Sequence, residues 1–264
     1  RSRICFCRFG ICGAGMSLFA HQLRSEQLVF WRSREAAIFI FVFPPMLFLL
    51  LGSVYGEGDI GGVPVTSYLV AGLLGYAVAN TAFGGLTIQL VIRREYGILK
   101  RIRATPLPAW LYLGCVLVSN LLVYVLQALV MLALALTLYD ADAPEASLSL
   151  LLVLTVGAVA FAGLGFGFAA VIRSSDAVAA VVNVVVLPMS FLSGAFGSTQ
   201  GYPAFLQAVS DVLPLTYFLD LTLSAYVDGQ GPWEDPVAVA AVAAWGLAGY
   251  LVAARRFTWQ PRDR

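Results

Sequence analysis

The residues that could carry chemistry in this chain are few, and nucleotide chemistry is the first class to consider. The chain has a single lysine, Lys100, which lies between Leu99 and Arg101. A phosphate-binding loop of the form G-x-x-x-x-G-K-[ST] needs its lysine directly after a glycine, so that the lysine reaches the β- and γ-phosphates. The sequence therefore predicts that the chain neither binds nor hydrolyses ATP by itself.

Acid–base and metal chemistry are equally poorly represented. The single histidine, His21, lies before the first long apolar run, where a lone histidine is more often solvated than catalytic. Cys5, Cys7 and Cys12 crowd the N-terminus, but no histidine or carboxylate lies among them to complete a metal site. No H-E-x-x-H or G-x-S-x-G motif is present. We therefore predict no catalytic residue and no metal site.

The long apolar runs also lack the charged groups of an independent carrier. Proton- or sodium-coupled carriers usually keep carboxylates or lysines in mid-membrane as relays. Asp220 is the nearest candidate, but it lies in a semi-apolar segment outside these runs, where a capping or interfacial role is the better interpretation. Energy for any transport is therefore expected to come from a partner.

The elements that would position these residues are membrane-spanning helices. The chain is 60% hydrophobic and only 12% charged, whereas a soluble domain carries about a quarter charged residues. Six apolar runs are long enough for a helix to cross roughly 30 Å of hydrocarbon, and a lone segment in lipid must satisfy its own backbone groups. The runs are about 36–53, 67–92, 110–138, 148–172, 177–196 and 236–254. The predicted fold class is therefore all-α: a polytopic membrane protein with six transmembrane helices.

The distribution of charge predicts the orientation of these spans. All 16 Lys and Arg residues fall in segments that alternating spans place on one side, whereas 10 of the 15 acidic residues fall on the other. Cytoplasmic loops accumulate Lys and Arg. We therefore expect a protein of the inner or plasma membrane with both termini in the cytoplasm.

The remaining segments complete the predicted domain organisation. We interpret residues 1–16 as a disordered N-terminal extension, 17–35 as an amphipathic interfacial helix, 36–256 as the six-span domain and 257–264 as a cytoplasmic tail. Residues 197–235 are too polar to span a membrane and too apolar to form a free loop. For this segment we expect two short helices that re-enter the outer membrane face.

The basic loop between the second and third spans, residues 93–108, has a helical pattern. On a wheel at 100° per residue, one arc holds Ile92, Tyr96, Ile98, Leu99 and Ile102, and the opposite arc holds Arg93, Arg94, Lys100 and Arg101. Such a helix can press its apolar face into a protein groove or into the headgroup layer. Composition alone, however, favours a loop that merely fixes orientation.

Two motifs resemble those of ABC-2 type permeases. The run R-R-E-Y-G-I-L-K-R-I-R-A-T-P-L-P at 93–108, followed at once by a long span, resembles the first cytoplasmic loop of that family. The matching positions are Glu95, Gly97, Thr105 and Pro106, while Ile98 stands where the family often has Thr. Residues 192–221 resemble the family's segment between the fifth and sixth spans, through Ser193-Gly194, Pro203 and the run from Pro214 to Tyr217.

This resemblance implies the permease subunit of an ATP-driven ABC exporter, which is not an enzyme alone. Its implied partners are a second permease copy, membrane lipid and a separate ATP-binding subunit that holds ATP and Mg²⁺. The implied coupling helix to the ATPase, supported by the N-terminal surface helix, comprises Arg93, Arg94, Glu95, Tyr96, Gly97, Leu99, Lys100, Ile102, Thr105 and Pro106. The implied outer gate in the re-entrant helices comprises Ser193, Gly194, Pro203, Pro214, Thr216 and Tyr217.

The substrate is defined only by class. Compact six-span members without a carbohydrate-binding extension resemble exporters of hydrophobic drugs, lipids or lipid-linked substrates. The sequence does not distinguish a homodimer from a heterodimer, and we expect no nucleic-acid partner. Two alternative functions are a self-sufficient carrier or channel, which would need intramembrane charges or a polar filter, and a membrane-embedded lipid-modifying enzyme, which would need convergent His, Asp or Ser side chains.

Overall fold

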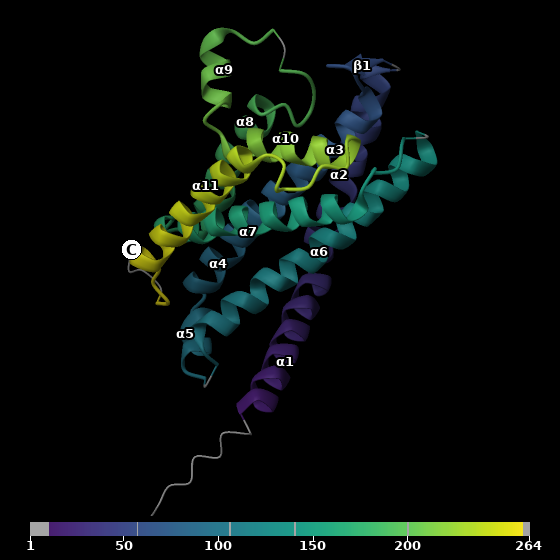
Figure 1. Ribbon diagram of the computed structural model, residues 1–264. Helices are drawn as coiled ribbons and strands as arrows, with labels where there is room; N and C mark the ends of the chain where they lie inside the picture. The colour runs from purple at the N-terminus through teal and green to yellow at the C-terminus, as the bar shows by residue number, and fades with distance from the viewer. Residues whose placement is uncertain (1–10, 57, 106, 140, 200, 261–264) are drawn as a thin grey trace, which may run out of the picture.

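The computed structural model describes residues 11–260, with 57, 106, 140 and 200 omitted. Its elements are α1 (Ile11–Arg32), α2 (Arg34–Tyr55), β1 (Asp59–Ile60), β2 (Val63–Pro64), α3 (Val65–Val78), the π-helix η1 (Ala79–Gly85), α4 (Leu86–Glu95), α5 (Ile98–Arg103), α6 (Ala109–Leu138), α7 (Ser147–Val171), α8 (Ser175–Leu192), α9 (Ala204–Ser210), α10 (Pro214–Val227) and α11 (Pro236–Arg256). In Figure 1, α5 and the beginning of α1 lie at one end of the molecule, and β1 and α9 lie at the other. We call these the basic end, after Lys100, Arg101 and Arg103 of α5, and the acidic end, after Asp59 of β1.

Six helical segments of the described chain are long and apolar enough to cross a membrane. They are Ala37–Tyr55, Val65–Glu95, Ala109–Leu138, Ser147–Val171, Ser175–Leu192 and Pro236–Arg256. The six predicted spans and the all-α class are thereby confirmed, and the chain is a multi-pass membrane protein. The fifth span ends at Leu192, earlier than the predicted Phe196, because turns follow in which Gly194 takes a left-handed φ of +83°.

Two helices connect the fifth and sixth spans, as predicted. The first, α9, follows Pro203, and the second, α10, begins at Pro214 with a bend of 77° between them. Proline is well suited to the first turn of a helix, because its fixed φ is helical and its missing N–H has no partner there. If the bent pair crossed the membrane it would add a seventh span. Its entry into the outer membrane face stays a prediction.

The N-terminal helix is longer than predicted. Helix α1 begins at Ile11, so the prediction that the whole of 1–16 is disordered is wrong for residues 11–16, while residues 1–10 lie outside the described part of the chain. Gly13 and Gly15 each weaken a helix by about 1 kcal/mol, a cost that the long helix following them tolerates. Helix α1 packs along α6, where the Gln27 amide donates to the backbone oxygen and the hydroxyl of Ser119, each at 2.9 Å.

A short hairpin at the acidic end was not predicted. Strands β1 and β2 pair antiparallel, with Asp59 opposite Pro64 and Ile60 opposite Val63. The two residues between the strands, Gly61 and Gly62, both have positive φ, which is the backbone that the tight turns of such hairpins require. The hairpin joins the first span to the second.

The second span lies at the centre of the molecule and contains a π-helical segment. From Leu69 to Ala79 almost every side chain is buried. Within η1 the hydrogen bonds reach one residue further than in an α-helix, as in the bond from the Leu86 N–H to the carbonyl of Thr81. The segment packs on α7, and the Thr87 hydroxyl donates to the carbonyls of Phe83 at 2.6 Å and Gly165 at 3.2 Å.

Helices α7 and α11 cross at a seam of glycines. A Cβ atom added to Gly249 would lie 2.3 Å from the carbonyl oxygen of Gly163, and one added to Gly163 would lie 2.4 Å from that of Gly246. No side chain larger than hydrogen fits at these separations. The two spans therefore pack backbone against backbone, as small residues permit in membranes.

Candidate functional site

The predicted coupling helix is two helices rather than one. Helix α4 ends at Glu95, and Gly97 takes a left-handed φ of +69° before α5 begins at Ile98. Left-handed backbone suits glycine, which lacks a Cβ, and commonly terminates helices. The wheel drawn through 92–103 mixes residues of two helices, so its placing of Arg93 and Arg94 on the same arc as Lys100 and Arg101 is wrong.

Arg93 joins α4 to α1 and α6. Its guanidinium donates to both carboxylate oxygens of Glu26, at 2.9 and 2.7 Å, and to the hydroxyl of Tyr112 at 2.7 Å. Both charged side chains are buried, and Gln22 donates a further hydrogen bond to Glu26 at 2.8 Å. On its other side, the Tyr112 ring lies against Trp259, with ring centroids 6.3 Å apart. The ion pair therefore links the N-terminal helix to two spans.

Arg94 joins α4 to the end of α7. Its side chain is 1% exposed, and its guanidinium donates to the carbonyls of Ala169, at 2.7 Å, and Ile172. The last carbonyls of a helix have no partner within it and carry partial negative charge. A cation in this position supplies the missing donors and complements that charge.

Glu95 joins α4 to the beginning of α8. Its carboxylate accepts a hydrogen bond from the N–H of Ser175, at 2.5 Å, and the neighbouring Ser174 hydroxyl accepts one from the N–H of Asp176, at 3.2 Å. The first N–H groups of a helix are unpaired and carry partial positive charge. The carboxylate of Glu95 therefore caps α8 from outside the helix.

Three consecutive side chains on the last turn of α4 thus each hold a different part of the molecule. We call Arg93, Arg94 and Glu95 the α4 anchor. The prediction that both arginines contact a partner is corrected by their burial, because their donors are used within the chain. The physical role that the contacts support is to fix the end of α4 against α1, α6, α7 and α8.

The short helix α5 presents most of its side chains outward. Leu99 is fully buried and Ile102 is partly buried, so these two residues fix α5 to the body of the protein. The remaining side chains of α5 project outward, with Ile98 40% exposed, and Tyr96, which lies between α4 and α5, is 71% exposed. We use the term docking surface for a set of exposed side chains, which are those of Tyr96, Ile98, Lys100, Arg101 and Arg103.

The loop after α5 turns toward α6. The Thr105 hydroxyl donates to the carbonyl of Ile102 at 2.6 Å, which closes the end of α5. Pro106, the other residue of the predicted Thr-Pro pair, lies outside the described residues. Thr105 therefore has a local structural role that the sequence pattern did not specify.

The residues of the predicted outer gate form a polar cluster at the acidic end. The Thr216 hydroxyl contacts the Ser193 hydroxyl at 3.0 Å and the Ser210 carbonyl at 2.7 Å, and the Ser210 hydroxyl donates to the carbonyl of Leu192 at 2.9 Å. The carbonyl of Gly194 accepts from Tyr68 at 3.1 Å. Helix ends from α8, α9 and α10 are thereby joined.

The other members of the predicted gate shape the helices around this cluster. Pro203 directly precedes α9 and Pro214 is the first residue of α10, and the Tyr217 hydroxyl donates to the carbonyl of Asp211 at 2.7 Å. The structure therefore brings Ser193 and Thr216 into contact, whereas Pro203, Pro214 and Tyr217 fix the backbone. Movement of this cluster as a gate stays a prediction.

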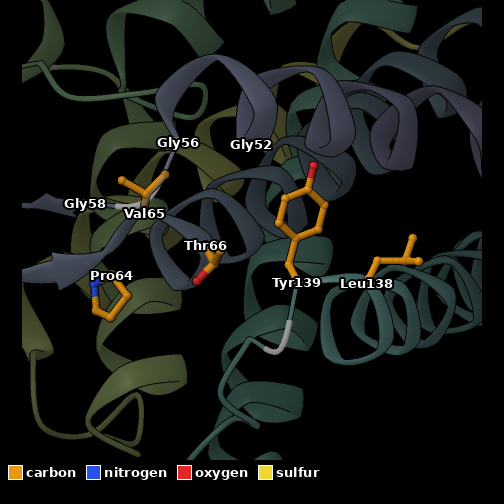
Figure 2. Close-up of a pocket in the computed structure, with 8 residues that line it drawn as sticks. All are labelled: Gly52, Gly56, Gly58, Pro64, Val65, Thr66, Leu138 and Tyr139. Atoms are coloured by element: carbon orange, nitrogen blue, oxygen red, sulfur yellow. The ribbon is translucent and has the colours of Figure 1, made fainter.

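A cavity of about 470 Å³ lies at the acidic end, between the end of α2, the beginning of α3 and the end of α6. Figure 2 shows its lining, which comprises Gly52, Gly56, Gly58, Pro64, Val65, Thr66, Leu138 and Tyr139. Among the described residues of the lining, the side-chain polar groups are the hydroxyls of Thr66 and Tyr139, and the latter donates to the carbonyl of Leu49 at 3.2 Å. None of the predicted site residues lines this cavity.

Sequence reasoning missed Glu26 and Tyr112, the two partners of Arg93. Glu26 was assigned only to an amphipathic surface helix, and Tyr112 only to the third span. One signal was available: Glu26 is an acidic residue in an N-terminal segment that carries Arg24, Arg32 and Arg34. An acidic residue among arginines indicates a cation partner, but it does not indicate which one.

Comparison with known proteins places this arrangement in a family. The model of the family described as ABC-2 type transporter matches residues 18–227, which include the α4 anchor, the docking surface and the polar cluster of the acidic end. A comparison with curated proteins found no match. The match covers most of the chain and includes the first five of the six spans. The chain therefore belongs to the ABC-2 type transporter family, as a membrane subunit for transport.

Proposed function

We propose that this chain is the permease subunit of an exporter driven by a separate ATP-binding subunit, which holds the ATP and Mg²⁺. The observation that carries the proposal is the docking surface on α5. Tyr96, directly before α5, and Ile98, on α5, offer exposed apolar area beside three cations, and the buried Leu99 and the adjoining α4 anchor fix this segment to the spans. A partner that moved α5 would therefore move the membrane helices.

The chemistry of the docking surface defines the chemistry of its partner. Tyrosine, tryptophan and arginine are the residues that most often dominate the binding energy of protein interfaces. A matching ATPase would offer an apolar groove with an acidic rim, so that Lys100, Arg101 and Arg103 meet carboxylates. We place this contact in the cytoplasm, with both termini on the same side, because Lys and Arg accumulate there.

We propose further that the cargo is a hydrophobic drug, lipid or lipid-linked molecule that moves out of the cytoplasm of the cell. The support is physical: the described span helices are lined by apolar side chains, with their charged residues at the helix ends. Such walls favour an amphiphilic or apolar molecule over a small ion, since an ion would lose its hydration without replacement ligands.

A second permease copy is proposed to pack against the outward face of α8. Asn183 lies in the middle of this span with its side chain exposed, and its amide makes no hydrogen bond to another described residue. Lipid tails offer no partner for an amide, whereas asparagine amides hydrogen-bond across packed helices. In a two-fold dimer a residue near the axis meets its own copy, and an amide can both donate and accept.

The direct test of the proposed function is reconstitution with the candidate ATPase. The chain alone in liposomes is expected to move no fluorescent lipid or drug and to hydrolyse no ATP, whereas the chain with its ATPase transports when Mg-ATP is added. Lys100→Glu combined with Arg101→Glu should abolish binding of the ATPase. Arg255→Glu, an exposed cation at the end of α11, is the matched control and should bind normally.

The same experiment decides between the proposed function and its alternatives. Transport by the chain alone without ATP would establish a self-sufficient carrier or channel. Covalent change of the lipid without its movement would establish a lipid-modifying enzyme. Either result would overturn the exporter proposal.

A further inference from the structure

Arg94 and Glu95 hold the two sides of a single turn. The Arg94 guanidinium binds the carbonyls of Ala169 and Ile172 at the end of α7, and the Glu95 carboxylate binds the N–H of Ser175 at the start of α8. Only residues 172–174 separate α7 from α8. Two adjacent side chains of α4 therefore bind the turn that joins the fourth and fifth spans.

The charges of Arg94 and Glu95 are opposite in sign to the partial charges of the helix ends that they contact. The carbonyl end of α7 is electronegative and faces a cation, while the amide end of α8 is electropositive and faces an anion. Exchange of the two residues would reverse both interactions. The burial of Arg94 strengthens the contact, because a buried guanidinium that lost these carbonyls would have no water to replace them.

These contacts can transmit movement, because Arg94 and Glu95 lie close to α5 in the chain. Arg94 and Glu95 belong to the last turn of α4, and α5 follows after Tyr96 and Gly97. If α4 turned or shifted, the α7–α8 turn would have to follow or break both sets of hydrogen bonds. Packed elements of this kind move as rigid bodies rather than deforming continuously.

We propose that Arg94 and Glu95 form a clamp that makes the α7–α8 turn move together with α4 and α5. Displacement of α5 is thereby passed to the beginning of α8, the fifth span, and not only along the second span. This inference rests on the proposed function for the source of the displacement, namely a bound ATPase. In this clamp Glu95 is a positioning residue, since it acts through α8 and contacts no substrate.

The first arm of the test uses the chain alone in lipid nanodiscs. Spin labels are placed at Ala104→Cys, directly after the last residue of α5 and outside the docking surface, and at Ala177→Cys on α8, both exposed positions, after the four native cysteines are replaced by serine. The distribution of label–label distances is expected to be narrow, to broaden in Glu95→Gln and to narrow again in Glu95→Asp, which restores the charge. Arg173→Gln, an exposed residue of the same turn, is the control and should change nothing.

The second arm uses the complex with its ATPase. The 104–177 distance is expected to be the same with and without bound nucleotide, because both labels move with one rigid body. In Glu95→Gln the ATPase should stay bound and hydrolyse ATP, while transport falls by at least about tenfold, the effect of losing one charge-assisted hydrogen bond. Transport by Glu95→Gln at the unsubstituted rate, or a nucleotide-dependent 104–177 distance in the chain with Glu95 intact, would overturn the clamp.

Failure of the clamp and failure of the proposed function give different results. If no ATPase binds the unsubstituted chain, the proposed function fails, and the first arm alone then decides the clamp. An unchanged distance distribution in Glu95→Gln overturns it whether or not an ATPase binds. If the ATPase binds and drives transport but Glu95→Gln behaves as the unsubstituted chain, the proposed function stands and the clamp does not.

Discussion

Glu26 of α1 and Arg93 of α4, 67 positions apart in the sequence, form a bidentate ion pair, with nitrogen–oxygen distances of 2.9 and 2.7 Å. Both side chains are buried, so neither charge is well hydrated. The attraction between them must offset the cost of removing two ions from water, which only a well-aligned pair can do. The pair places an N-terminal helix that is not one of the six spans in direct contact with the end of the second span.

Loss of one member of this pair should be more damaging than loss of both. Glu26→Ala leaves the Arg93 guanidinium buried without its counter-charge, which we expect to lower the free energy of unfolding by about 3–5 kcal/mol. Glu26→Gln combined with Arg93→Gln should cost less. Thermal unfolding in detergent micelles measures both, with Glu35→Gln, an exposed acid, as the control. A double variant less stable than Glu26→Ala would contradict the expectation.

Tyr96 should be an energetic centre of the docking surface. Its ring is 71% exposed in the single chain, and truncation of a buried interfacial aromatic typically costs about 2 kcal/mol. Tyr96→Ala is therefore expected to weaken binding of the ATPase by roughly thirtyfold. The dissociation constant, measured by surface plasmon resonance on nanodiscs, checks this. Unchanged affinity would place the interface elsewhere.

The glycine seam between α7 and α11 should tolerate no methyl group. In Gly249→Ala the new Cβ would lie 2.3 Å from the carbonyl oxygen of Gly163, so the two spans must separate. We expect a loss of about 1–3 kcal/mol in the free energy of unfolding, as for other overpacked interiors. Gly114→Ala on α6 is the matched control, since no atom lies within 4 Å of its added Cβ. Equal melting temperatures for both variants would show that the seam is not tightly packed.

Asn183 should lie close to its own copy in the assembled transporter. After replacement of the native cysteines, Asn183→Cys is expected to form a disulfide-linked dimer in membranes treated with a mild oxidant. Leu251→Cys on α11, which is also an exposed position in a span, should remain monomeric. A cross-link at Leu251 and none at Asn183 would move the proposed interface from α8 to α11.

The spans could be predicted because their signal is local. Each apolar run is longer than a soluble strand or helix requires, and the segregation of Lys and Arg restricts the number of crossings. Helices α9 and α10 were also predicted from a local signal. The segment is moderately apolar, and Pro203 directly before α9 and Pro214 at the start of α10 divide it. The hairpin was missed because two strands of two residues each leave no alternating pattern.

The roles of the coupling residues could not be predicted because they depend on distant partners. The pattern around Glu95 and Gly97 predicted a helix in this segment, but a wheel cannot show that Gly97 separates two helices. Nor can the sequence show that Arg93 faces Glu26, or that Arg94 faces the end of α7. Cations in a loop that is predicted to face water are usually solvated, and here two of them are buried by helices that fold against the loop from elsewhere in the chain.

The π-helix at Ala79–Gly85 also bears on how the second span can change its length. A π turn holds one residue more than an α turn, so deletion of one residue from this segment converts it to ordinary α-helix and leaves the flanking faces in phase. A deletion closer to Arg93, within the regular α-helix, would instead rotate everything beyond it by about 100°. Arg93, Arg94 and Glu95 would then point at the wrong neighbours. Deletion of one residue within Ala79–Gly85 therefore preserves the orientation of the flanking helices, whereas deletion in the regular α-helical turns that follow does not.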